Sequence, residues 1–123
     1  MKKKILVVED EQMQAKLIVN TLIKEDSEVF LCEEGNYAKT ILNINKFDMI
    51  FLDINIPNIS GLKLLELIRS DKENTNYSTP VVICTTSDDN KDRMESFKNK
   101  ANEYFLKPIL PEKIKSTISF YLS

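Results

Sequence analysis

The chain has 123 residues, of which 42% are apolar and 29% charged, so it can bury one core, and we expect residues 1–123 to form one domain. Its 17 basic and 19 acidic residues give a net charge of −2, which argues against direct binding to nucleic acid. The chain has no histidine, which excludes histidine-based zinc sites, histidine-dependent triads and a histidine phosphoacceptor.

The amino-terminal apolar run, Ile5 to Val8, is short. A signal peptide needs an apolar stretch of about 7–15 residues and a membrane span about 20. We therefore expect a cytoplasmic protein with no membrane contact.

Strand-like apolar runs alternate with helical patterns five times along the chain. The runs cover residues 4–8, 28–32, 48–53, 80–84 and 103–106. Apolar residues at helical spacing predict the buried faces of the helices that follow: Ala15, Ile18 and Leu22; Ala38, Ile41 and Leu42; Leu64, Leu65 and Ile68; Met94, Phe97 and Ala101; and Ile114, Ile118, Tyr121 and Leu122. Ser60 is expected to cap the third helix, Pro111 to start the fifth, and residues 70–79 to form a polar loop.

Five such units predict an α/β fold, in which a parallel sheet lies between two layers of helices. Crossovers are right-handed, so the sheet must be doubly wound for helices to cover both faces. Sheets of this type bind ligands beyond the carboxyl ends of their strands. The functional residues are therefore expected at those ends.

Candidate functional residues end or follow four of the five predicted strands: Glu9, Asp10 and Glu11; Asp53; Thr85, Thr86 and Ser87; and Lys107. Two carboxylates about 4 Å apart repel by about 4 kcal/mol at an effective dielectric constant of about 20, so the acidic group needs a cation. Mg²⁺ prefers oxygen ligands and suits such a cluster. Lys107 and Thr85 would contact phosphoryl oxygens, and an Asp carboxylate can accept a phosphoryl group.

These segments resemble the receiver domains of two-component response regulators, the CheY-like superfamily. The resemblance covers the whole chain and rests on the runs at residues 5–11, 53–61, 80–85 and 104–109. It implies a flavodoxin-like (βα)5 three-layer sandwich with strand order 2-1-3-4-5. In that order Cys32 and Cys84 lie about 14 Å apart, too far for a disulfide, so both are expected to be free thiols.

The resemblance assigns the phosphoryl chemistry to Asp53 as phosphoacceptor, with Thr85 and Lys107 contacting the phosphoryl group. The bond between Lys107 and Pro108 would be cis. Mg²⁺, with Mn²⁺ as an alternative, would be held by the residues that match the family's metal ligands: Glu9 through water, Asp10, Asp53 and the backbone carbonyl of Asn55.

The resemblance also implies a switch. Tyr104 would turn inward on activation together with Thr85, and the surface of the fourth helix, fifth strand and fifth helix would change. Asn55, Thr86 and Ser87 would tune the phosphoryl lifetime. The family usually has a small residue where Thr86 stands, so we expect slower phosphoryl exchange than in a Thr86→Ala variant. It also usually has Gly-Ala where this chain has Lys100-Ala101.

The implied protein is a signalling switch that catalyses only its own phosphorylation and dephosphorylation. A histidine kinase or phosphotransfer protein would be the donor. The output would pass to a downstream protein, or to a tethered output domain if the chain is a fragment, with no direct contact to nucleic acid.

Two other functions stay open at this point. A hydrolase that forms an aspartyl phosphate needs an acid two residues after the nucleophile, where this chain has Asn55. A degenerate receiver that only binds partners would have lost the acidic pair, the Asp or the Lys. Taken singly, the residues also fit ordinary roles: residues 9–11 an acidic loop with a helix cap, Lys107 a surface lysine and Tyr104 an edge aromatic.

Overall fold

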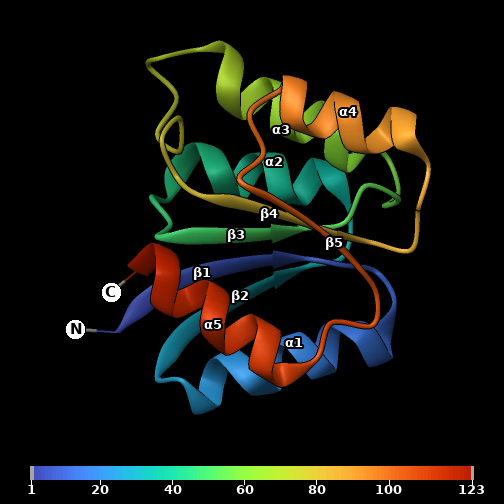
Figure 1. The fold of residues 1–123 in the computed structure, drawn as a ribbon. Coiled ribbons are helices and arrows are strands. Elements are labelled where there is room, and N and C mark those ends of the chain that lie inside the picture. Colours follow the sequence, from blue (N-terminus) through green and yellow to red (C-terminus); the bar gives the residue numbers. More distant parts are fainter. Residues whose placement is uncertain (1, 123) are drawn as a thin grey trace.

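Five strands form one parallel sheet at the centre of the computed structural model, which describes residues 2–122 (Figure 1). They are β1 (Lys3–Val8), β2 (Ser27–Cys32), β3 (Met49–Leu52), β4 (Val81–Thr85) and β5 (Glu103–Leu106). Their order is β2-β1-β3-β4-β5, and every neighbouring pair is parallel. The predicted doubly wound α/β sandwich and its strand order are confirmed.

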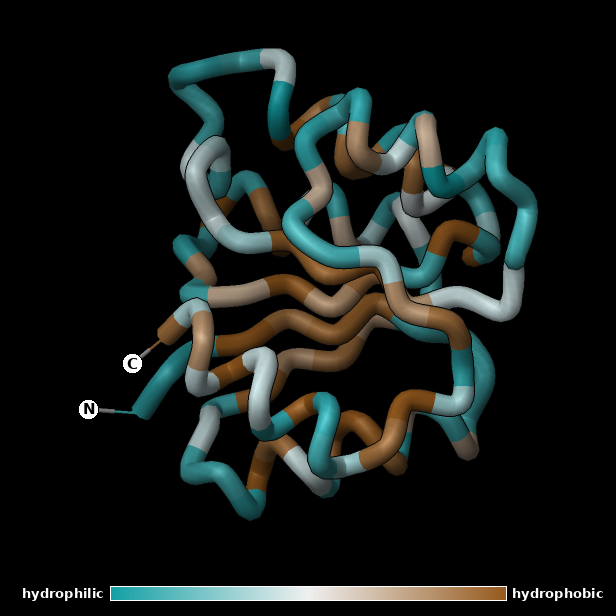
Figure 2. The backbone as a smooth tube through the Cα atoms, in the orientation of Figure 1, coloured by the Kyte–Doolittle hydropathy of each residue, from teal (hydrophilic) through white to brown (hydrophobic). Residues whose placement is uncertain are grey.

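The helices cover the two faces of this sheet. They are α1 (Gln12–Lys24), α2 (Gly35–Ile44), α3 (Gly61–Ser70), α4 (Asn90–Lys98) and α5 (Pro111–Leu122). Helices α1 and α5 pack on one face and α2, α3 and α4 on the other (Figure 1). Apolar residues line the strands between the layers, whereas the outer surfaces of the helices are largely hydrophilic (Figure 2).

Most of the predicted core residues are buried as expected. Those of α1 and α3 are all buried, and so are Ala38 and Leu42 of α2 and Ile114 of α5. The remaining predicted residues of α5 are half-buried against the same core. Ser60 caps α3 by accepting a hydrogen bond from the Lys63 N–H at 3.2 Å, as predicted.

The prediction for the fourth helix was wrong. Helix α4 ends at Lys98, so Ala101 lies outside it, while Met94 is 70% and Phe97 46% exposed. The residue that α4 buries is Ser96, whose hydroxyl donates to the Asp92 carbonyl at 2.8 Å. Because α4 is short and polar, its apolar residues do not define the face that it packs against the sheet.

Ala101 reaches the core from the turn after α4. Lys100 there has φ = 67°, a left-handed conformation in which a glycine has no steric cost. Ala101 then packs with the core cluster on the α2–α3 side of the sheet.

The predicted loop at residues 70–79 lies almost wholly outside the helices and strands, because α3 ends at Ser70. It is nevertheless firmly bonded to the rest of the domain. The Arg69 guanidinium donates to the carbonyls of Tyr77 (2.8 Å) and Thr79 (2.7 Å), and its Nε donates to the Lys100 carbonyl (3.1 Å). One side chain thus joins the loop to the turn after α4.

Both cysteines are buried free thiols, as predicted. Cys32 ends β2 and Cys84 lies in β4, with β1 and β3 between these strands. Burial raises the pKa of Cys32 to about 11 and raises that of Cys84 as well, so both stay protonated at neutral pH. No helix within residues 2–122 is long and apolar enough to cross a membrane.

Candidate functional site

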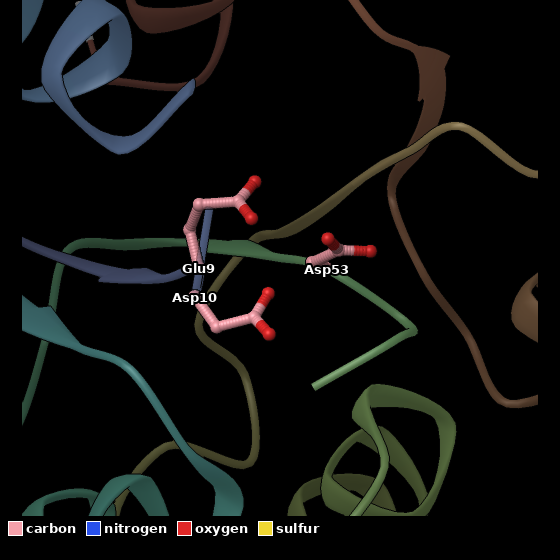
Figure 3. Close-up of side chains that lie close together, drawn as sticks. All are labelled: Glu9, Asp10 and Asp53. Carbon is pink, nitrogen blue, oxygen red and sulfur yellow. The ribbon is translucent and has the colours of Figure 1, made fainter. Parts of the chain in front are cut away.

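Three carboxylates meet beyond the carboxyl ends of β1 and β3 (Figure 3). Oxygens of Glu9, Asp10 and Asp53 lie within 4.8 Å of one another. The two strands are neighbours, and their register pairs Val8 with Leu52, so the residues that follow leave the sheet side by side. The predicted acidic cluster therefore forms, although Asp53 lies over forty positions after Glu9 and Asp10 in the sequence.

Backbone hydrogen bonds hold the acidic residues in place. The Asp53 N–H donates to the Val8 carbonyl at 3.0 Å, and the Glu9 N–H donates to the Cys32 carbonyl at 2.9 Å. The Asn55 N–H in turn donates to Asp53 Oδ1 at 3.1 Å. The backbone of the acidic residues is thus held in place by the neighbouring strands.

Lys107 closes the cluster from the end of β5. Its Nζ lies 2.7 Å from Asp53 Oδ2 and also contacts Glu9 Oε1, and its side chain is only 5% exposed. Burial alone would lower the pKa of Lys107, but the hydrogen bonds to the two carboxylates raise it overall. Burial raises the pKa of Glu9, because the desolvation outweighs the favourable effect of the ammonium group.

The donor set fits a hard divalent cation. Three carboxylates against one ammonium leave an excess of negative charge, and Asp10 is exposed, so the cluster opens to solvent. Glu9 Oε1 is buried against the Lys107 ammonium group, and a carboxylate oxygen in that position keeps a second lone pair. Oxygen ligands of this kind bind Mg²⁺ and Mn²⁺.

The hydroxyl residues at the end of β4 lie in different environments. Thr85 is fully buried, and its Oγ1 accepts a hydrogen bond from the Ser87 N–H at 3.2 Å. Thr86 is exposed, Ser87 is half-buried and the side chain of Asn55 is exposed. Glu11, which follows the acidic pair, caps α1 through the N–H groups of its first turn.

Tyr104 lies inward and is buried. Its hydroxyl donates to the Ser87 carbonyl at 2.8 Å, and the Arg93 guanidinium lies 4.7 Å from its ring centroid. Burial raises the pKa of Tyr104, so the phenol remains a hydrogen-bond donor at neutral pH. The bond between Lys107 and Pro108 is cis, as the resemblance implied.

Sequence reasoning missed two residues of α4 beside this site. Asp92 accepts a hydrogen bond from Ser87 Oγ at 2.6 Å, and Arg93 covers Tyr104. Both belong to a helix whose polar residues look uniformly solvated in the sequence. Helix α4 begins at Asn90, and the fold places its first turn beside Ser87, which the sequence pattern does not indicate.

Comparisons with known proteins agree with this geometry. The family model described as response regulator receiver domain matches residues 5–119. Response regulator ArlR of Staphylococcus saprophyticus is 34% identical over 115 residues, a match that covers 94% of this chain and 50% of ArlR. The chain thus spans about half the length of the curated relatives it matches.

Two solved structures extend the comparison to shape. The phosphorylated cyanobacterial phytochrome response regulator RcpA has a TM-score of 0.89 and 30% identity, with 100% of this chain and 96% of that chain covered. The Mn²⁺-bound form of response regulator Rcp1 has a TM-score of 0.85 and 28% identity, with 98% and 95% covered. The chain is therefore similar both to a phosphorylated protein and to a metal-bound one.

Proposed function

Since the chain belongs to the family of response regulator receiver domains, which are signalling switches, we propose that Asp53 is the residue that accepts the phosphoryl group. In the transfer, an Asp53 carboxylate oxygen attacks the phosphorus of a phosphohistidine. The bond between phosphorus and the imidazole nitrogen breaks, and the histidine leaves with the electron pair. The acceptor carries the phosphoryl group as an acyl phosphate.

The observation that carries this proposal is the Lys107 ammonium group bonded to Asp53 Oδ2 at 2.7 Å in a buried site. Phosphoryl transfer needs positioning and neutralisation of charge more than covalent help from the protein. Lys107 supplies a fixed positive charge on one side of Asp53. Thr85 stands at the end of the neighbouring strand β4, where its hydroxyl can bond a phosphoryl oxygen.

The metal would be held by Glu9, Asp10, Asp53 and the backbone carbonyl of Asn55. When bound, Mg²⁺ or Mn²⁺ neutralises charge on the phosphoryl oxygens as a Lewis acid. The acidic cluster supports this part of the proposal, since its charge excess is otherwise uncompensated.

The output would pass through the surface formed by α4, β5 and α5. Tyr104 belongs to β5 and is covered by Arg93 of α4, so a change at Thr85 can reach that surface through Ser87 and Tyr104. The donor would be a cytoplasmic histidine kinase or a phosphotransfer protein. The receiver would serve a downstream protein or a tethered output domain, and would catalyse only its own phosphorylation and dephosphorylation.

The test is a mass measurement after incubation with acetyl phosphate and Mg²⁺. We expect the mass to rise by one phosphoryl group in the wild type and in the control variant Asp88→Asn, which changes an exposed carboxylate on the loop before α4. We expect no increase in Asp53→Ala or when a chelator removes the metal. A phosphoryl group retained by Asp53→Ala would refute the assignment, and steady turnover of a simple phosphate ester would favour a hydrolase instead.

A further inference from the structure

Strand β2 forms one edge of the sheet, and within residues 2–122 it pairs with β1 alone (Figure 1). The Cys32 carbonyl accepts from the Glu9 N–H at 2.9 Å, so the backbone groups of Cys32 point toward β1. Successive residues of a strand direct these groups to opposite sides, so Phe30 also faces β1, whereas Val29 and Leu31 face outward. The N–H and C=O groups of Val29 and Leu31 thus form an open edge to which another strand can bond.

Apolar side chains beside this edge are only partly covered. Leu31 is 41% exposed, and Val29 and Phe30 are half-buried on opposite faces of the sheet. On the face covered by α1, Leu31 lines a groove of about 290 Å³ together with Ala15 and Val19 of that helix. Because side chains alternate between the faces of a sheet, every second side chain of an added strand would enter this groove.

The charge around the edge is mainly negative. Residues 24–34 include five acidic residues and one basic residue, and four of the carboxylates are exposed: Glu25, Asp26, Glu28 and Glu33. None of these four forms an ion pair within the part of the chain that the structure describes. Opposite charges on neighbouring strands stabilise a sheet, and like charges destabilise it. The edge therefore favours a basic strand, and it disfavours a second copy of itself.

We propose that β2 binds an extended basic segment of another protein, which adds to the sheet as a sixth strand. The backbone of the segment bonds to Val29 and Leu31, and its apolar side chains enter the groove beside α1. Its Lys or Arg side chains alternate with these and lie on the other face, next to Glu28. Strand β5 forms the opposite edge of the sheet, so this partner stays clear of the α4–β5–α5 surface.

Fluorescence anisotropy of the labelled peptide Lys-Val-Lys-Val-Lys-Val-Lys, with both ends blocked, measures binding to the full chain. We expect Glu28→Lys to bind it about two to thirty times more weakly than the wild type, because an opposite-charge pair becomes a like-charge pair. Glu112→Lys makes the same change at an exposed position of α5 and is expected to leave the affinity unchanged. No binding by the wild type, or equal binding of a peptide with Glu in place of Lys, would overturn the proposal.

Hydrogen exchange of single amides, followed by NMR, tests whether the peptide is added as a strand. We expect the amides of Val29 and Leu31 to gain protection on binding, because they acquire acceptors. The amide of Phe30 already faces β1 and is expected to change little, as are the amides of β5. A change that does not alternate along β2 would show attraction by charge alone and would contradict strand addition.

Two further measurements separate the backbone bonds and the occupant. Only alternate residues of an added strand bond to β2, so of two peptides, one N-methylated at the valines and one at the lysines, we expect one to lose its binding. Undiminished binding of both would overturn the proposal. Protection of Val29 and Leu31 that rises with protein concentration in the absence of peptide would show that a second copy covers the edge, and would overturn the assigned occupant.

Discussion

Asn76 makes a strong prediction about stability, because its side chain is wholly buried among backbone groups. Its Nδ2 donates to the carbonyls of Leu42 and Asn45, both at 2.8 Å. Its Oδ1 accepts from the Phe47 N–H at 2.9 Å and from the Thr79 hydroxyl at 3.0 Å. This one amide group therefore ties the loop before β4 to the segment between α2 and β3.

The change Asn76→Ala removes all of these bonds at once. It leaves two carbonyls and one N–H without their partner in a region that excludes water. Each unsatisfied buried group costs about 1–3 kcal/mol, so we expect the free energy of unfolding to fall by about 3–9 kcal/mol. A domain of this size has about 5–15 kcal/mol in total, so the variant would be close to unfolding at 37 °C.

Urea unfolding followed by far-UV circular dichroism measures the loss. We expect a lower midpoint with an unchanged m-value, since the surface exposed on unfolding stays the same. Asn43→Ala, at an exposed position of α2, is the matched control and is expected to change stability by less than about 0.5 kcal/mol. A loss below about 1 kcal/mol in Asn76→Ala would show that water replaces the lost bonds and would refute the reasoning.

Three further predictions concern the site and its support. Glu9→Gln should raise the stability of the metal-free domain at neutral pH, because burial raises the pKa of the Glu9 carboxyl above its ordinary value of 4.5. The favourable contribution of Glu9 to the free energy of unfolding is therefore present below pH 4.5 and is lost as the pH rises and the buried carboxyl ionises. Thermal unfolding from pH 4 to 8 checks this, and a benefit that grew toward low pH would contradict it. Gly35→Ala should cost about 1–3 kcal/mol, because a Cβ there would lie 2.1 Å from the Ile59 carbonyl oxygen; a neutral result in urea unfolding would show that the loop after β3 can yield. Thr86→Ala should exchange its phosphoryl group faster than the wild type, and equal or slower exchange, measured by mass, would contradict the prediction that the larger Thr86 side chain slows exchange.

The sequence alone determined the sheet and the place of the site. Runs such as residues 5–8 and 49–52 are apolar throughout, and a strand of this kind is stable only when helices cover both of its faces. Parallel strands bring their carboxyl ends to one edge. Glu9, Asp53 and Lys107 were therefore expected together, and the structure brings them into contact.

Only the tertiary structure decided how the polar side chains are used. The prediction for α4 failed because Met94 and Phe97 look like a buried stripe, although the helix packs through Ser96. Arg69 bonds to the Lys100 carbonyl, and Ser87 bonds to Asp92 across the start of a helix. Hydrophobic periodicity indicates which residues are buried. A hydrogen bond instead requires two particular atoms to approach within about 3 Å, and that distance is fixed only when the helices and the sheet have packed together.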